Sequence, residues 1–320
     1  MEEKARILGK ATPRFTKMLT WKYGQLSGKS VQQDFAQHHG INVSKKLIQG
    51  QMDRLGQEMI EKEKKWTYEI PPLGAEVFTI GISRDGTTVP IKGEGYKEAM
   101  AGTISLYDQQ GNRLHTIYTG CSPEHGRSSF ESVFQMEIER VKNQYPEAEY
   151  VGIADGEKGN WRFLQQYTHT QILDFYHAAS YLGDYAKVVY QDPDERKKWT
   201  TQNCSALKHE PSGAQQILSE MKQNGPAHFT EDKLDPVSRA ITYFSNHIGK
   251  MNYRQYQKQK LPIGSGVVEA ACKTLVKQRL SKSGSRWTRQ TVDQILMIRG
   301  LILTEDRWNQ FWKKVDRYGF

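Results

Sequence analysis

Two aspartates, each followed by glycine, stand where a folded chain can gather them around a divalent cation. Asp85 lies in SRDGTT and Asp155 lies in GIADGE. Glycine lets the backbone turn away, and side chains at the carboxyl ends of neighbouring strands meet at one edge of an α/β sheet. Two carboxylates held close together repel each other unless a cation lies between them, and Mg²⁺ or Mn²⁺ prefers oxygen ligands. The two Asp–Gly dipeptides together therefore predict a metal site, although either dipeptide alone more often marks only a turn.

A third acidic residue, Glu269, follows the glycine-rich segment 262–266 and begins a stretch with helical spacing. Ser265 is placed to cap this helix. Lys273 and Lys277 follow at four and eight residues after Glu269, so a regular helix would present all three on one face. An acidic side chain among Lys and Arg side chains suits a metal site that faces a phosphate backbone. The alternative is an exposed Glu–Lys pair, which contributes about 0.3 kcal/mol.

The positive charge of the chain is concentrated in its C-terminal fifth. The formal net charge is +9, and residues 251–320 carry 14 Lys and Arg against 5 Asp and Glu, whereas residues 1–250 carry 31 of each. A basic segment with interleaved aromatic residues suits DNA, because each neutralised phosphate releases counterions. A solvated helix face is the alternative interpretation. The predicted phosphate contacts are Lys273, Lys277, Arg279, Lys282, Arg286 and Arg289.

Strands must position the carboxylates, and five short segments have strand character. They are rich in β-branched or aromatic residues and are bounded by Gly, Asp or Asn. Stretches with helical spacing follow the third, fourth and fifth segments, which predicts an α/β fold with an RNase H-like mixed sheet. Asp85 then directly follows the first strand and Asp155 the fourth. The strands are expected at 77–82, 100–106, 114–118, 150–154 and 172–175, and the helices at 129–145, 158–166 and 178–190.

Residues 1–70 are predicted to form an all-α, helix-turn-helix region with a linker at 61–65 before two prolines. Apolar residues recur at helical spacing, Gly40 can take a positive φ in a tight turn, and Ser44 can cap the next helix. The second helix of such a motif lies against DNA, although any small helical hairpin shares the pattern. The predicted DNA contacts are Lys45, Lys46, Gln49 and Arg54.

Residues 71–320 are predicted to form one catalytic domain. Within it, about 193–258 has the pattern of polar helices, broken at 211–213 and 224–226, and is expected to be a helical insertion. Basic helices are expected at 263–320. The three cysteines form no CxxC pair, and neither a secretory signal nor an apolar run long enough to span a membrane is present, so a reducing cytoplasm is expected.

Four segments resemble the DDE transposases of bacterial insertion sequences, and the ISKra group most closely. They are SRDGTTVPIKG, GIADGEKGNW, ILDFYHAASYL and PIGSGVVEAACKTLVKQRLSKSGSRWT. The resemblance covers nearly the whole chain and implies that Asp85, Asp155 and Glu269 are the catalytic triad. Asp174 and His177 resemble an accessory D/CxxH element of the related Mutator-like transposases. A lone His after a strand, however, more often serves packing or hydrogen bonding.

The resemblance also implies the chemistry and the partners. Two Mg²⁺ or Mn²⁺ ions about 3.5–4 Å apart would be held with Asp85 on both, Asp155 on one and Glu269 on the other. The substrates would be the terminal repeats of an insertion sequence and target DNA, bound by a homo-oligomer without a membrane, in the bacterial cytoplasm and nucleoid.

Two other functions stay open at this point. Members of the family carry more chain before their first helices than precedes Thr12, so a truncated or domesticated DNA-binding repressor without catalysis is the main alternative. The second is an RNase H-like nuclease that acts on RNA or branched DNA.

Overall fold

The computed structural model describes residues 11–63, 66–124, 127–224 and 231–319. Among these residues, five strands form one mixed sheet of order β3-β2-β1-β4-β5. The second strand is antiparallel to the first and third, whereas the fourth is parallel to the first and fifth. The strands are β1 (Thr79–Ile91), β2 (Gly95–Tyr107), β3 (Arg113–Cys121), β4 (Glu149–Ala154) and β5 (Thr170–Leu173). The prediction of an α/β fold with a mixed sheet is confirmed.

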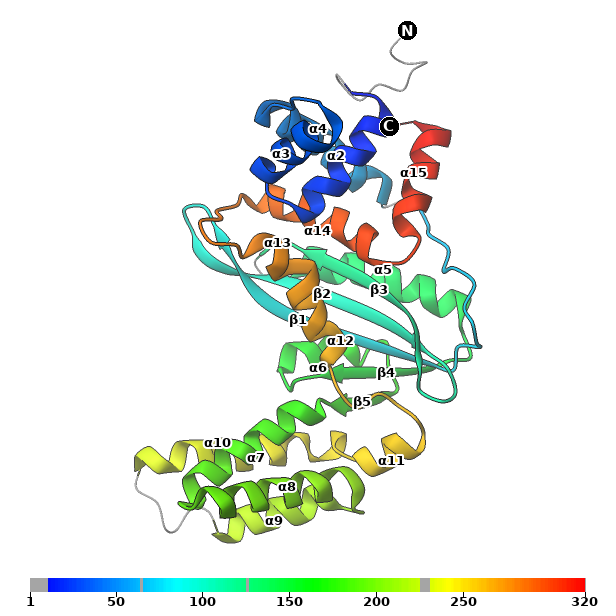
Figure 1. Ribbon diagram of the computed structural model, residues 1–320. Helices are drawn as coiled ribbons and strands as arrows, with labels where there is room; N and C mark the ends of the chain where they lie inside the picture. Colours follow the sequence, from blue (N-terminus) through cyan, green and yellow to red (C-terminus); the bar gives the residue numbers. More distant parts are fainter. Residues whose placement is uncertain (1–10, 64–65, 125–126, 225–230, 320) are drawn as a thin grey trace.

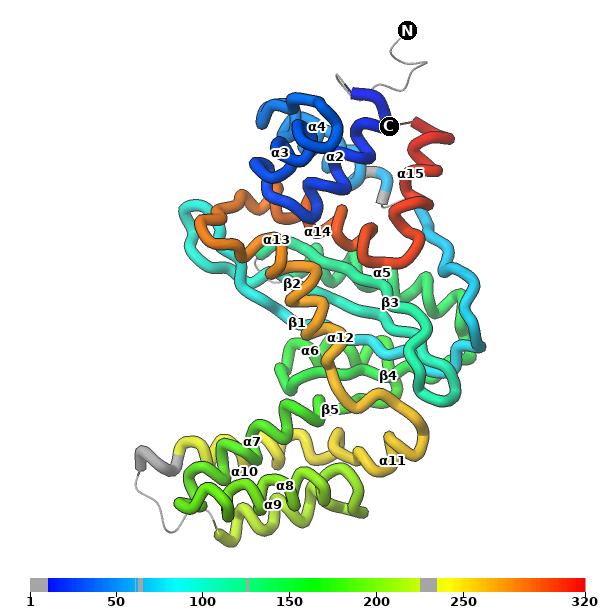
Figure 2. Tube along the Cα trace, in the orientation of Figure 1, coloured from blue at the N-terminus to red at the C-terminus, as the bar shows by residue number. Residues whose placement is uncertain are grey.

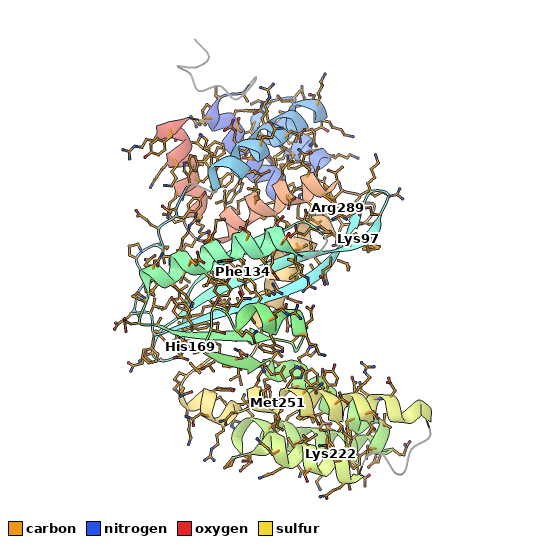
Figure 3. The ribbon with its side chains drawn as sticks, turned by 180° about the vertical axis from the view of Figure 1, so that it is seen from behind. Lys97, Phe134, His169, Lys222, Met251 and Arg289 are labelled. Carbon is orange, nitrogen blue, oxygen red and sulfur yellow. The ribbon has the colours of Figure 1, made fainter. Side chains whose placement is uncertain are left out.

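Helices on one face of the sheet make the parallel pairs possible. Parallel strands need a crossover, which α5 (Ser128–Gln144) supplies before β4 and α6 (Lys158–Leu164) supplies before β5. The ring of Phe134 on α5 lies against Gly102 of β2, where an added Cβ would come within 2.8 Å of it. Figure 3 shows Phe134 and α5 in front of the sheet when the molecule is seen from behind. The bare backbone at Gly102 therefore lets this helix approach closely.

The opposite face carries a broken helix and a long helix (Figure 1). The broken helix consists of α12 (Gly266–Ala271), the π-helical η3 (Cys272–Lys277) and α13 (Gln278–Leu280). The long helix, α14 (Arg289–Leu303), lies along β3. Asp293 accepts a hydrogen bond from the backbone N–H of Ser122 (2.7 Å), and Thr304 accepts one from that of Tyr118 (3.1 Å). Side chains of α14 and of the residue after it therefore accept hydrogen bonds from backbone N–H groups along and just after the edge strand β3.

The N-terminal helices share a core with the C-terminal helices. They are α2 (Pro13–Gln25), α3 (Gly28–His39) and α4 (Lys45–Glu63), and the last helix is α15 (Arg307–Tyr318). The blue and red ends of the tube lie side by side in Figure 2, and the rings of Trp21 and Trp308 are 5.4 Å apart. The predicted boundary at residue 70 therefore does not separate two packing units, because one apolar cluster contains residues from both sides of it. The predicted linker is also wrong for 61–63, which continue α4, while 64–65 lie outside the described residues.

Residues 193–258 are largely helical, as predicted, and with α7 (Phe175–Val189) they form the end of the molecule beyond β5 (Figure 1). They follow α7, the helix expected after the fifth strand. The break at 211–213 lies between α8 and α9, and part of the break at 224–226 lies outside the described residues. The insertion consists of α8 (Pro193–His209), α9 (Gly213–Asn224), α10 (Glu231–His247), η2 (Ile248–Lys250) and α11 (Tyr253–Lys258).

None of the helices among the described residues has the length and apolar character needed to cross a lipid bilayer.

One buried side chain, Arg299 of α14, joins the three parts of the shared core. Its Nε donates to the carbonyl of Leu275 and its Nη1 to that of Gly24, each at 2.7 Å, and its Nη2 donates to the carbonyl of Thr274. Burial, and secondarily the charge of Arg279, lower the pKa of Arg299 to about 10. Arg299 thus connects α14 to η3 and to α2.

We expect Arg299→Met to destabilise the protein by about 3 kcal/mol, because it leaves buried carbonyl oxygens without a donor. Urea unfolding of the whole chain measures this change. Arg317→Met on α15 is the matched control, since Arg317 is exposed and its replacement should cost less than about 0.5 kcal/mol. Equal stability of the two variants would show that Arg299 does not hold the helices together.

Candidate functional site

A pocket with a volume of about 230 Å³ lies where β1, β4 and α12 meet. The fold brings the three predicted acidic residues to this pocket from positions far apart in the sequence. The predicted accessory residue His177 also lines it. The lining residues are Arg84, Asp85, Ala154, Asp155, His177, Ser265, Val268 and Glu269.

Asp85 lies within β1, opposite Ala101 of β2, and not after the strand as predicted. The reason is that β1 leaves the sheet as one arm of a long hairpin: its pairing with β4 ends at Ser83, but its pairing with β2 continues to Ile91. Asp85 thus occupies the point where the parallel pairing stops. The sequence pattern placed the end of the strand before Asp85 and could not show that the strand continues to Ile91.

The carboxylate of Asp85 is partly buried and is surrounded by negative charge. Burial raises its pKa, the backbone N–H of Gly86 lowers it, and the charges of Asp155 and Glu269 raise it further. Its Oδ1 accepts from Gly86 N at 2.7 Å, and its Oδ2 accepts a weak hydrogen bond from the thiol of Cys272 at 3.5 Å. Burial raises the pKa of Cys272 strongly, so this residue remains a neutral thiol donor.

Asp155 directly follows β4, where it was expected, and helix α10 holds the turn that it begins. The hydroxyl of Tyr243 donates to the carbonyl oxygen of Asp155 at 2.6 Å, and His247 Nε2 lies 3.2 Å from the carbonyl oxygen of Gly156. Gly156 has φ 111°, and an added Cβ there would come within 2.9 Å of the Tyr243 ring. Sequence reasoning missed Tyr243 and His247, because no motif connects them to a turn about ninety residues away.

Glu269 lies on α12 and accepts a hydrogen bond from the hydroxyl of Ser265 through Oε1 at 2.8 Å. Ser265 occupies the predicted cap position, but its side chain makes no capping hydrogen bond and serves the carboxylate instead. The predicted regular spacing to Lys273 and Lys277 is also wrong. Both lysines lie in the π-helical η3, which has more residues per turn than an α-helix, although both are exposed as expected.

Asp174 is completely buried and connects three segments. It caps α7 through Oδ1, which accepts from His177 N at 2.5 Å, and its Oδ2 accepts from the backbone N–H of Ser265. Its own N–H donates to the carbonyl of Ala154 at 2.8 Å. Asp174 therefore sets the segment before Glu269 against the end of β4. The ring of His177 lines the pocket and packs against Tyr181 and Tyr243, with centroids 5.9 and 6.0 Å away.

The turn before α4 has the predicted local features. Gly40 has φ 62°, and Ser44 Oγ accepts from the backbone N–H of Leu47 at 3.1 Å. The predicted DNA contacts on α4 and in the C-terminal region are exposed with two exceptions. The exposed residues are Lys45, Lys46, Gln49, Arg54, Lys273, Lys277, Lys282 and Arg286.

Arg279 and Arg289 are the exceptions. Arg279 is 1% exposed, and its guanidinium lies between the rings of Tyr23 and Trp287, 4.9 Å from each centroid. The prediction that Arg279 contacts phosphate is therefore wrong, because this face of the helix packs against α2. Arg289 is partly exposed but is paired with Glu94 at 2.5 Å, so most of its charge is compensated.

Lys97 is an exposed basic residue that the sequence reasoning missed. It lies near Arg289 at the end of the β1–β2 hairpin in Figure 3, and both residues line a second pocket of about 350 Å³. The long hairpin places it there, and the two glycines at its turn, Gly93 and Gly95, are the local signal that could have indicated this hairpin.

Within the described ranges, no group of three or more His, Cys, Asp or Glu side chains is arranged so that it could hold a metal ion. The pocket nevertheless offers the oxygen ligands that Mg²⁺ and Mn²⁺ prefer. Burial, and to a lesser extent the charges of Asp155 and Glu269, raise the pKa of Asp85, so a cation in the pocket would stabilise its ionised form. The chemistry of the donor set thus fits a divalent ion.

A comparison of the chain with models of protein families finds no match, and no curated protein matches it significantly.

We expect Asp85→Asn to stabilise the metal-free protein by about 1 kcal/mol at neutral pH, a gain typical of removing a strained functional group. The pKa of Asp85 is raised above 3.8 by burial, so the folded state holds this proton to a higher pH than the unfolded chain. The cost of ionising Asp85 therefore appears as the pH rises through the folded-state pKa and persists above it. Below pH 3.8 the variant should have no advantage.

Thermal or urea unfolding of both proteins between pH 4 and pH 8, in the presence of a chelator, measures this difference. Asp184→Asn is the matched control, because Asp184 lies on an exposed face of α7. A difference between Asp85→Asn and the parent that does not depend on pH would contradict the explanation by burial and repulsion.

Proposed function

We propose that this protein is a DDE-type transposase that cleaves DNA strands at the ends of an insertion sequence and joins them to target DNA. The observation that carries this proposal is the convergence of Asp85, Asp155 and Glu269 on one pocket. The strand order supports it, because three antiparallel strands followed by two parallel ones are the arrangement expected of an RNase H-like sheet. The turn between α3 and α4 supports a helix-turn-helix contact with DNA.

The three carboxylates are the residues that would hold Mg²⁺ or Mn²⁺, with two ions as the expected number. When bound, the metal would supply positive charge that lowers the pKa of a water nucleophile and stabilises negative charge on the leaving 3′ oxygen. Asp85 and Asp155 come from adjacent strands, so their spacing is set by the sheet. Glu269 comes from a helix whose start is held by Asp174 and Ser265.

Residues next to the pocket position these acidic side chains. Tyr243 and His247 hold the backbone after β4, so the side chain of Asp155 starts from a fixed turn. Cys272 donates to Asp85 from within η3, which ties the basic helix to the central strand. The helix that carries Glu269 thus also carries Lys273 and Lys277, which are exposed to contact the phosphates next to the cleaved bond.

The partners follow from the same surfaces. Exposed Lys and Arg side chains on α4 would bind the terminal repeats, and those after α12 would hold the DNA at the pocket. The protein would act as a homo-oligomer assembled on DNA, in the cytoplasm and nucleoid of a bacterium.

We expect Asp85→Ala, Asp155→Ala and Glu269→Ala each to reduce Mg²⁺-dependent strand cleavage by more than about a hundredfold, the upper end for residues that only support a metal ligand. DNA retention in a gel shift should change little, because the basic residues remain. The substrate is a labelled duplex that carries the DNA flanking the gene, and Asp184→Ala on the exposed face of α7 is the control. DNA retention without any cleavage by the unaltered chain would instead favour a repressor.

We expect Lys273→Ala to weaken DNA binding and to make the dependence of log K on log salt shallower by about 1, the change for one lost phosphate contact. Titrations at several salt concentrations measure the slope. Lys222→Ala is the matched control, because Lys222 is exposed on α9, in the insertion (Figure 3). Equal slopes for Lys273→Ala and the parent would show that Lys273 is exposed to solvent and does not contact a DNA phosphate.

A further inference from the structure

Arg84, the residue before Asp85, is a buried cation that has no part in the proposed reaction so far. Its side chain is 1% exposed, and its guanidinium stacks on the ring of Phe163, 4.6 Å from the centroid. Successive residues of a strand point to opposite faces of the sheet, so Arg84 faces α5 and α6 whereas Asp85 faces η3. Burying such a charge is costly unless hydrogen bonds compensate it. Its partners therefore show what Arg84 holds in place.

Three oxygen atoms accept hydrogen bonds from the guanidinium. Nη1 donates to Glu131 Oε1 at 2.6 Å, and Nη2 donates to the carbonyl of Gly159 at 2.8 Å. Nε donates to Asn160 Oδ1 at 2.9 Å. Two of these three acceptors belong to the first turn of α6, the helix that follows Asp155. Arg84 thus fixes this turn against β1.

The contact with Arg84 determines the orientation of the Asn160 amide. Asn160 is 2% exposed, and only its oxygen can face an N–H of the guanidinium. Its Nδ2 is then directed toward Asp155 Oδ1, at 3.4 Å. The same Oδ1 accepts from the backbone N–H of Glu157 at 3.1 Å. In the described residues, the hydrogen bonds to the Asp155 side chain all use Oδ1, which leaves Oδ2 for the pocket.

We propose that Arg84 and Asn160 form a relay that positions Asp155 for a divalent cation. Arg84 orients the Asn160 amide, and the amide holds one carboxylate oxygen of Asp155. A neutral amide next to Asp155 leaves the carboxylate its full negative charge, whereas a direct Arg–Asp pair would compensate this charge in advance. Both are positioning residues, since they act through Asp155. This inference rests on the proposed function, because it requires that Asp155 binds the cation.

Calorimetric titration with Mn²⁺ alone tests the relay in the full chain. We expect Asn160→Ala to weaken Mn²⁺ binding at least about tenfold, the usual effect of removing a partner that orients a metal ligand. Arg84→Lys should weaken it similarly, because an ammonium group cannot make the three directed contacts of the guanidinium. The double variant should bind no more weakly than Asn160→Ala, because the two residues act through one chain of contacts.

Arg307→Lys is the matched control. Arg307 is also buried, pairs with Glu137 at 2.6 Å and lies over the ring of Tyr68, 5.1 Å from the centroid, but it does not line the pocket. We expect this variant to lose thermal stability and to keep the Mn²⁺ affinity of the parent. A general loss of packing would lower stability in both arginine variants without this difference in affinity.

The possible results separate the relay from the proposed function. A folded Asn160→Ala protein with the parental affinity for Mn²⁺ would overturn the relay, and so would additive losses in the double variant. If the parent and Asp155→Ala bind Mn²⁺ equally, then Asp155 holds no cation, and the proposed function fails together with the inference. Weaker binding in Asp155→Ala, Asn160→Ala and Arg84→Lys, but not in Arg307→Lys, is the result expected from the relay.

Discussion

The convergence of three acidic side chains on one partly buried pocket is the constraint around which the neighbouring structure is arranged. Asp85, Asp155 and Glu269 line one pocket, and the pKa of Asp85 reflects both its burial and the charges of the other two. A chain left to itself would move such groups apart. Here the sheet fixes the first two, and the buried Asp174 fixes the segment that leads to the third. Buried polar contacts around the pocket therefore determine where the three acidic side chains lie.

Strand β1 connects the two apolar cores of the molecule, because its alternating residues face one core or the other. One core lies on the side of α5, α6 and the insertion, and the other contains the terminal helices and η3. Arg84 faces the first, and Asp85 contacts Cys272 of the second. Asp85 is held by Gly86 and by Cys272 of η3, and Asp155 is held by Asn160 of α6 and Tyr243 of α10. A change in either core would be transmitted to the pocket through a single strand.

Local patterns in the sequence predicted the elements well and the positions of single side chains less well. The strand segments, the helical character of 193–258 and the positive φ of Gly40 follow from nearby residue types, and the structure confirms them. The burial of Arg279 depends on α2, more than 250 residues away, so charge and composition misplaced it. The role of Tyr243 likewise depends on where the insertion folds back. Such tertiary contacts have no signature in a sequence window, and the π-helical η3 shows that even a clear helical pattern can hide a change of spacing.

The core shared by the two ends of the chain has a consequence for synthesis. Helices α2, α3 and α4 are translated well before the residues whose apolar surface they share, which include Ile295, Phe311 and Val315. The apolar side chains of these helices therefore stay exposed until the helices at 289–318 have been synthesised. A chaperone that shields nascent chains would find its target in this early segment. Premature termination would leave the segment permanently without its partner and expose it to proteolysis.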